Sequence, residues 1–181
     1  MNIKGKIFVC LLLAVSQSAC AGEARFDEIY AHCKSETVNK NKKVIVDNGF
    51  ISNIIDGDLN FERVNRKYVG VKASGFDIVN KHDPSITDHV VILNPSGNYF
   101  AYYKASDRIF PLCVSVEAGD FELMSGISIG QPLSVIKDKF KFAELVDVLV
   151  IQDFEGGNIV ELYFDKSHRL KKITVRAEYL G

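Results

Sequence analysis

A serine between two glycines is the first candidate for catalysis in this sequence. Residues 126–130 read GISIG and match the G-x-S-x-G pattern of hydrolases, with Ser128 as nucleophile and His168 as base. The acidic members that would complete this triad in chain order are Asp147, Asp153 and Asp165. The mechanism needs a parallel sheet that places the serine at a strand end, which the order of elements described below does not predict. Glycines that lead into a helix explain the pentapeptide without chemistry, so hydrolysis is the alternative function.

Two histidines and two aspartates flank Pro84 and form a second candidate site. His82, Asp83, Asp88 and His89 are ligand types that bind Zn²⁺ or another divalent ion. Their spacing is not one of the familiar metal signatures, and an aspartate before a proline is what turn chemistry predicts. We therefore expect no metal and no other cofactor.

One expected strand concentrates aromatic side chains. Alternation along the strand places Tyr99, Ala101 and Tyr103 on one face and Phe100 and Tyr102 on the other. One of these faces must belong to the core. Tyrosines on the opposite face are enriched in protein interfaces, so Tyr99 and Tyr103 are the candidate partner-binding residues. A structural role for both faces is the competing interpretation.

Residues 1–21 have the organisation of a secretory signal peptide. Lys4 and Lys6 form a positive n-region, residues 7–15 are an uninterrupted apolar h-region, and residues 19–21 read ACA, a small-residue cleavage site. The apolar run is too short to span a bilayer as a helix. The sequence therefore predicts an exported, periplasmic bacterial protein.

The cleavage point decides whether the mature protein is free or tethered to a membrane. A cut after Ala21 releases residues 22–181, a length suited to one domain with a hydrophobic core. A cut before Cys20 would leave a lipidated N-terminus, because residues 18–20 read SAC as at the end of a lipoprotein site. Gln17 stands where that site usually has an aliphatic residue, which favours the first cut. No later stretch predicts a transmembrane span.

Removal of the leader also simplifies the cysteine content and the charge. Cys33 and Cys113 remain after the favoured cut, and in an oxidising compartment this pair predicts a disulfide. The full chain has a net charge of −1, and loss of the leader removes two lysines and no acidic residue. An acidic mature chain lacks the basic footprint of a nucleic-acid-binding protein.

The first elements of the mature chain are expected to be one helix and a series of strands. Residues 23–33 place Phe26, Ile29, Tyr30 and Cys33 on one helical stripe. Residues 44–116 are rich in β-branched and aromatic residues broken by turn signals, which predicts strands. Within them we expect turns at 47–49 and 56–58, a hairpin of 89–93 with 99–103, and a strand at 111–117 that carries Cys113.

The remaining elements define the fold class. A helix is expected at 132–142, followed by three antiparallel strands at 146–154, 159–164 and 170–179. Strands and helices do not alternate as in a parallel sheet. The sequence therefore predicts an α+β fold with helices packed on an antiparallel sheet, a C-terminal three-stranded meander and one disulfide.

The C-terminal third resembles a module of small exported proteins. Residues 126–140 read GISIGQPLSVIKDKF and residues 162–173 read LYFDKSHRLKKI. This pattern is similar to the helix-plus-meander module of β-lactamase-inhibitor-like proteins and of the small lipoprotein of the outer-membrane assembly machine. Those modules usually have two helices before the meander, whereas one is expected here. The resemblance implies a non-enzymatic protein that binds another protein through its sheet face and loops.

The predicted function follows from these observations. We expect an exported bacterial protein that binds another protein non-catalytically, as an inhibitor, an immunity factor or an envelope accessory. The alternatives are an envelope hydrolase that uses Ser128 and His168, and a lipid-tethered envelope assembly protein that uses Cys20.

Overall fold

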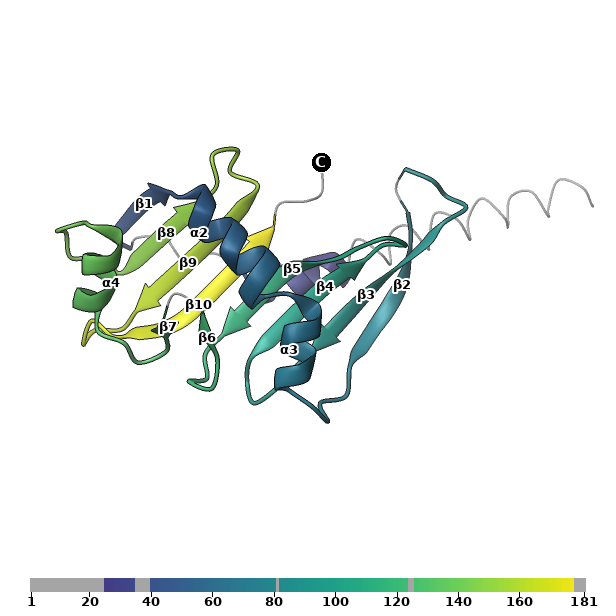
Figure 1. Ribbon diagram of the computed structural model, residues 1–181, viewed down its shortest axis with the longest axis horizontal. Helices are drawn as coiled ribbons and strands as arrows, with labels where there is room; N and C mark the ends of the chain where they lie inside the picture. The colour runs from purple at the N-terminus through teal and green to yellow at the C-terminus, as the bar shows by residue number, and fades with distance from the viewer. Residues whose placement is uncertain (1–24, 35–39, 81, 124–125, 178–181) are drawn as a thin grey trace, which may run out of the picture.

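The fold is built on one mixed sheet of eight strands. A computed structural model describes residues 25–34, 40–80, 82–123 and 126–177. The strand order is β1-β8-β9-β10-β5-β4-β3-β2, and β6 and β7 form a separate two-stranded sheet (Figure 1). Helices and a large sheet are both present, and all strand pairs of that sheet except β1 with β8 are antiparallel, which agrees with the predicted α+β class.

The bounds of the elements are as follows. The labelled helices are α2 (Asn48–Ser52), the π-helix η1 (Asn53–Asp58), α3 (Phe61–Lys67) and α4 (Leu133–Phe140). The first strands are β1 (Lys42–Val46), β2 (Ser74–Val79), β3 (Thr87–Leu93), β4 (Tyr99–Lys104) and β5 (Ile109–Val116). The others are β6 (Glu122–Leu123), β7 (Ile127–Ser128), β8 (Val148–Gln152), β9 (Asn158–Phe164) and β10 (Leu170–Ala177). Residues 25–32 are also helical.

The sheet departs from the antiparallel prediction at one edge. β2 to β5 pair antiparallel in sequence order, as do β8 to β10, and β5 pairs antiparallel with β10 in the centre. β1 instead lies parallel to β8, with Val44 opposite Val150. A parallel pair needs a long connection, and every element from α2 to α4 lies between these two strands. The predicted antiparallel sheet was therefore wrong at β1, because this long connection lets β8 run in the same direction as β1.

Residues 48–58 and 61–67 are helical, although the sequence analysis assigned 44–116 to strands and turns. The Asp47 carboxylate accepts a hydrogen bond from the backbone N–H of Phe50 at 2.9 Å, and Asn60 caps α3 in the same way. Aspartate and asparagine are favoured at helix N-caps as well as in turns. Here the segment is helical because this conformation buries its apolar side chains in the core. Those buried side chains are Phe50, Ile51, Ile54, Leu59 and Val64.

The side of the sheet covered by α2, η1 and α3 is called the helical face. Figure 1 shows these elements crossing the sheet, with α4 at the β8 end. Phe50 of α2 contacts Phe140 of α4 edge-on at 5.0 Å between ring centroids, and Phe61 of α3 contacts Tyr102 at 5.2 Å. One apolar cluster runs under all of them. Its sheet residues include Phe100, Val114, Leu149, Leu162 and Ile173.

The opposite side is called the disulfide face. Cys33, at the end of the helical residues 25–32, is bonded to Cys113 of β5 with an S–S distance of 1.99 Å, which confirms the predicted disulfide. Ile29 is 2% exposed, and Phe26 packs edge-on against Phe76 of β2 at 6.2 Å. The expected apolar stripe is therefore the side that contacts the sheet. Among the described residues, no helix is long and apolar enough to cross a membrane.

The disulfide face also buries a polar cluster on the C-terminal strands. Glu161 of β9 is 5% exposed and Thr174 of β10 is 2% exposed. One oxygen of the Glu161 carboxylate, Oε2, accepts hydrogen bonds from the Tyr163 hydroxyl at 2.5 Å and the Thr174 hydroxyl at 3.3 Å. These bonds compensate part of the cost of burying a carboxylate.

Candidate functional site

The two tyrosines predicted to bind a partner lie on the disulfide face. Tyr99 is 7% exposed and its ring stacks on His32 at 3.9 Å between centroids. The Tyr103 hydroxyl donates to Asp88 at 2.5 Å, and its ring stacks on Phe110 at 5.3 Å. Burial is the main cause that raises the pKa of both tyrosines to about 12. Their contact with a partner stays a prediction, and Tyr99 would need His32 to move.

The aspartates and histidines around Pro84 do not converge. Asp88 and His89 are adjacent in β3, so their side chains point to opposite faces of the sheet. The His89 ring contacts Asp77 at 2.6 Å, whereas Asp88 accepts from Asn80 and Tyr103. Asp83 accepts two hydrogen bonds from Ser85, which lower the pKa of its carboxyl. Within the ranges that the structure describes, no group of three or more such residues is placed to hold a metal ion.

The serine of the GISIG pentapeptide lies in β7. No hydrogen bond joins Ser128 and His168 among the described residues. The backbone oxygen of Ser128 accepts from Gln131 N, and that of His168 accepts from Leu133 N. His168 has a φ of 57° in the turn between β9 and β10. Asp165 accepts backbone hydrogen bonds in the same turn, and these lower the pKa of its carboxyl. The pentapeptide thus leads into α4, and hydrolysis by these residues stays an untested alternative.

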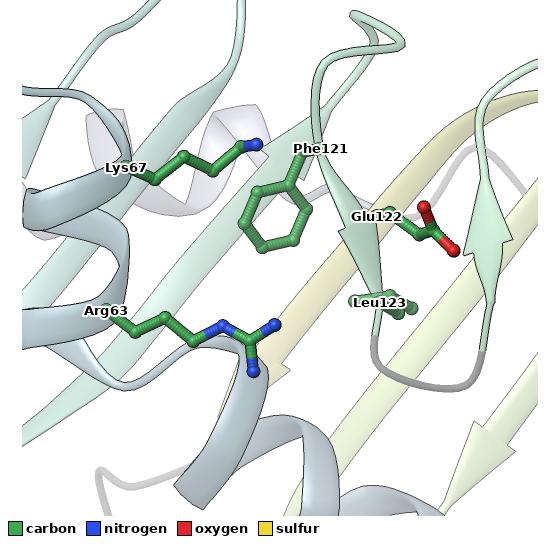
Figure 2. Close-up of a pocket in the computed structure, with 5 residues that line it drawn as sticks. All are labelled: Arg63, Lys67, Phe121, Glu122 and Leu123. Carbon is green, nitrogen blue, oxygen red and sulfur yellow. The ribbon is translucent and has the colours of Figure 1, made fainter.

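A pocket of about 330 Å³ lies between α3 and β6, and the sequence analysis did not anticipate it. Figure 2 shows Arg63 and Lys67 reaching from α3 toward the ring of Phe121. The Glu122 carboxylate points away from both cationic groups. The lining residues are Arg63, Lys67, Phe121, Glu122 and Leu123.

The wall of the pocket formed by α3 is set by helical spacing and by one ion pair. Arg63 and Lys67 are four residues apart and therefore project from the same side of α3, while Val64 is fully buried beneath the helix. The Arg63 guanidinium lies 3.2 Å from the carboxylate of Asp58, whose side chain is 2% exposed. This contact orients the guanidinium and leaves some of its five N–H donors for another acceptor.

The floor of the pocket is held by a polar network behind it. Phe121 packs on Phe100 at 5.3 Å between ring centroids. The Asn98 amide donates to the Asp120 carboxylate at 2.8 Å and to the Tyr68 hydroxyl at 3.2 Å. Its carbonyl oxygen accepts from two backbone N–H groups after β5. The loop that carries Phe121 is therefore fixed, and burial raises the pKa of Tyr68 to about 12.

The second accessible feature is the outer edge of the sheet at β1. This strand pairs with β8 on one side, and the sheet has no described strand on its other side. Val44 and Val46 are 46% and 54% exposed, and Phe154, at the same end of the strands, is 80% exposed. The backbone N–H of Phe154 bonds to the Asn48 side chain at 2.8 Å, which holds the turn beside the end of β1. These three residues and the unpaired side of β1 are called the β1 edge.

The pocket and the β1 edge both depend on tertiary structure. Arg63 and Phe121 are far apart in the sequence, and neither has a motif around it. Residues 44–46 read VIV, so the sequence shows neither that Val44 and Val46 are exposed nor that their strand stands at the edge of the sheet. No protein-family model, curated protein or solved structure matches this chain. The resemblance of the C-terminal third therefore stays a prediction.

Proposed function

We propose that this chain is an exported bacterial protein that binds another protein without catalysis, as an inhibitor, an immunity factor or an envelope accessory. Export is supported by the signal-like residues 1–21 and by the disulfide, because disulfides persist in oxidising compartments. The proposed contact surface is the β1 edge.

The observation that carries this proposal is a strand edge that pairs with no other strand among the described residues and is flanked by exposed apolar side chains. The outward N–H and C=O groups of an edge strand are a template for a strand from another chain. Val44 and Val46, on one face of the sheet, would lie beside alternate side chains of the added strand, and Phe154 would lie near its end. Natural edges are protected by proline, bulges or charges. β1 has lysines at its first two positions, Lys42 and Lys43, whereas residues 44–46 read VIV and carry no such protection.

The test compares two surface variants of the mature protein. Val44→Lys with Val46→Lys places charges on the β1 edge, whereas the control Val135→Lys places one on α4, where Val135 is 49% exposed. Each protein is immobilised and exposed to envelope extracts of its own bacterium and of competing bacteria, and retained proteins are identified by mass spectrometry. We expect wild type and the control to retain the same protein and the edge variant to lose it.

Two outcomes contradict this proposal. One is a partner that the edge variant retains as well as wild type does. The other is the absence of any retained protein from either extract while all three proteins show the same cooperative thermal unfolding. Equal melting temperatures are expected, because the substituted valines are exposed.

A further inference from the structure

We propose that the pocket between α3 and β6 binds a carboxylate joined to a small apolar or aromatic group. This inference goes beyond the proposed protein binding and does not depend on the β1 edge. In this proposal Arg63 and Lys67 bind the carboxylate, and Phe121 contacts the apolar group.

The cationic wall offers hydrogen-bond donors that the fold does not use. The Lys67 ammonium lies 5.7 Å from the centroid of the Tyr68 ring and makes no hydrogen bond or ion pair among the described residues. Within the part of the chain that the structure describes, Arg63 has one ion pair, with Asp58, and a guanidinium has five N–H donors. A carboxylate between these two groups would accept from both, and charge-assisted hydrogen bonds are stronger than neutral ones.

The charge of the pocket favours an anion over a cation. Asp58 is buried and already faces Arg63, so it does not present a free carboxylate to the pocket. Glu122 belongs to the lining, but its side chain turns toward the β7 side, where a Cβ added at Gly126 would come 3.8 Å from its Oε1. The groups that point toward Phe121 are therefore the two cations.

The floor limits the apolar part of the ligand to a small group. Phe121 and Leu123 are 3% and 1% exposed, so they present only the outer edges of their side chains. A cavity of about 330 Å³ is at the small end of ligand pockets, which suits a single side chain or one ring. An amino-acid derivative or the C-terminal residue of a peptide has this chemistry. We expect a dissociation constant of about 1 mM.

The experiment uses the full mature protein labelled with ¹⁵N and N-acetyl-L-phenylalanine as the probe. Amide shifts are followed by NMR as the probe is added, in parallel with N-acetyl-L-phenylalaninamide, which keeps the ring and removes the charge. We expect saturable shifts in α3 and around Phe121, and binding of the amide weaker by about tenfold.

An acetylated glycine peptide ending in phenylalanine distinguishes the two possible sources of the carboxylate, a small amino-acid derivative and the C-terminus of a protein. Equal or tighter binding of this peptide points to a protein C-terminus, and binding of the amino acid alone points to a small molecule.

Matched variants on one helix separate binding from folding. Lys67→Gln removes a cation that lines the pocket, whereas Arg66→Gln removes one that the pocket does not include. Both residues are exposed, so both variants should melt with the wild type. We expect Lys67→Gln to weaken binding of the probe by about tenfold and Arg66→Gln to leave it unchanged. The proposal is overturned by equal binding of acid and amide, by equal loss in both variants, or by no saturable shift up to about 20 mM probe.

Discussion

The two halves of the sheet share the same order of elements but differ on the disulfide face. In each, a helix precedes a series of antiparallel strands: α3 precedes β2 to β5, and α4 precedes β8 to β10. The two halves meet in the centre of the sheet, where β5, the last strand of the first half, pairs with β10, the last strand of the second. On the helical face both halves contribute to one apolar cluster.

The disulfide face is where the halves differ. The N-terminal half buries apolar residues such as Val90 against Ile29 of the helical segment that ends at Cys33, whereas the C-terminal half buries Glu161 with its hydroxyl donors beside a small apolar cluster that includes Val148. A short helix buries little apolar area, so a covalent bond to the sheet adds what packing does not supply. A polar cluster within neighbouring strands is stabilised by hydrogen bonds and needs no such link.

The largest predicted effect comes from removing the disulfide. Replacing Cys33 and Cys113 by serine should lower the free energy of unfolding by about 4.5 kcal/mol, because the bond closes a sequence separation of 80 residues. Amide hydrogen exchange should accelerate first in residues 25–34 and in β4 and β5. Chemical denaturation measures the loss and hydrogen exchange measures its location.

Reduced wild-type protein is the matched control for this variant. It should show the same loss of stability, because it lacks the same bond and a cysteine thiol is close in size to a serine hydroxyl. If exchange accelerates equally in β8 to β10 and in the N-terminal half, the disulfide stabilises the whole sheet and the contrast between the halves is wrong.

The second prediction compares one buried tyrosine hydroxyl in each half. Tyr163 of β9 and Tyr102 of β4 are both 0% exposed. The Tyr163 hydroxyl donates to Glu161, so Tyr163→Phe should destabilise the protein by about 1–3 kcal/mol. Within the described ranges the Tyr102 hydroxyl has no hydrogen-bond partner, so Tyr102→Phe should change stability by less than about 1 kcal/mol or increase it. Urea denaturation of both variants checks this, and equal losses would contradict it.

The smallest predicted effect is a dependence of stability on pH. It is absent at neutral pH and appears in alkali. The pKa values of Tyr99 and Tyr103 are raised from 10 to about 12, chiefly by burial, and both residues lie in the N-terminal half. The unfolded chain therefore loses these protons first. Their contribution to stability is complete below pH 10 and is lost as the pH rises to about 12.

Melting temperature measured against pH, together with tyrosinate absorbance, tests this dependence. We expect the melting temperature to fall above pH 10, the ordinary tyrosine pKa, and to fall less steeply for Tyr99→Phe. A Tyr99→Phe protein with the same slope as wild type would show that this tyrosine does not link stability to pH.

Local patterns predicted several elements well. The hairpin expected at 89–93 and 99–103 corresponds to β3 and β4, because Pro95 and Gly97 between them favour a turn and β-branched residues flank it. The stripe of Phe26, Ile29 and Cys33 likewise faces the sheet. In these cases the period of the apolar residues and the turn chemistry agree, so neighbouring residues are sufficient.

Other elements required the tertiary structure. Asp47 reads equally as a turn residue and as a helix N-cap, and the presence of the sheet beneath Phe50 and Ile54 decides for the helix. The parallel position of β1 was not predictable either, because its partner β8 is distant in the chain. The pocket has the same origin, since its cationic wall and its floor come from separate segments.

The sequence alone determined the α+β class, the pairing of Cys33 with Cys113 and the faces of the aromatic strand. The class and the two faces depend on residue types and on a spacing of two or about four residues along one segment. The cysteine pairing follows because removal of the leader by the favoured cut leaves only these two cysteines. The tertiary structure alone decided which strands stand at the edges and that Arg63 and Lys67 face Phe121. Those features depend on contacts between segments distant in the chain, whose formation is governed by burial of the whole apolar cluster.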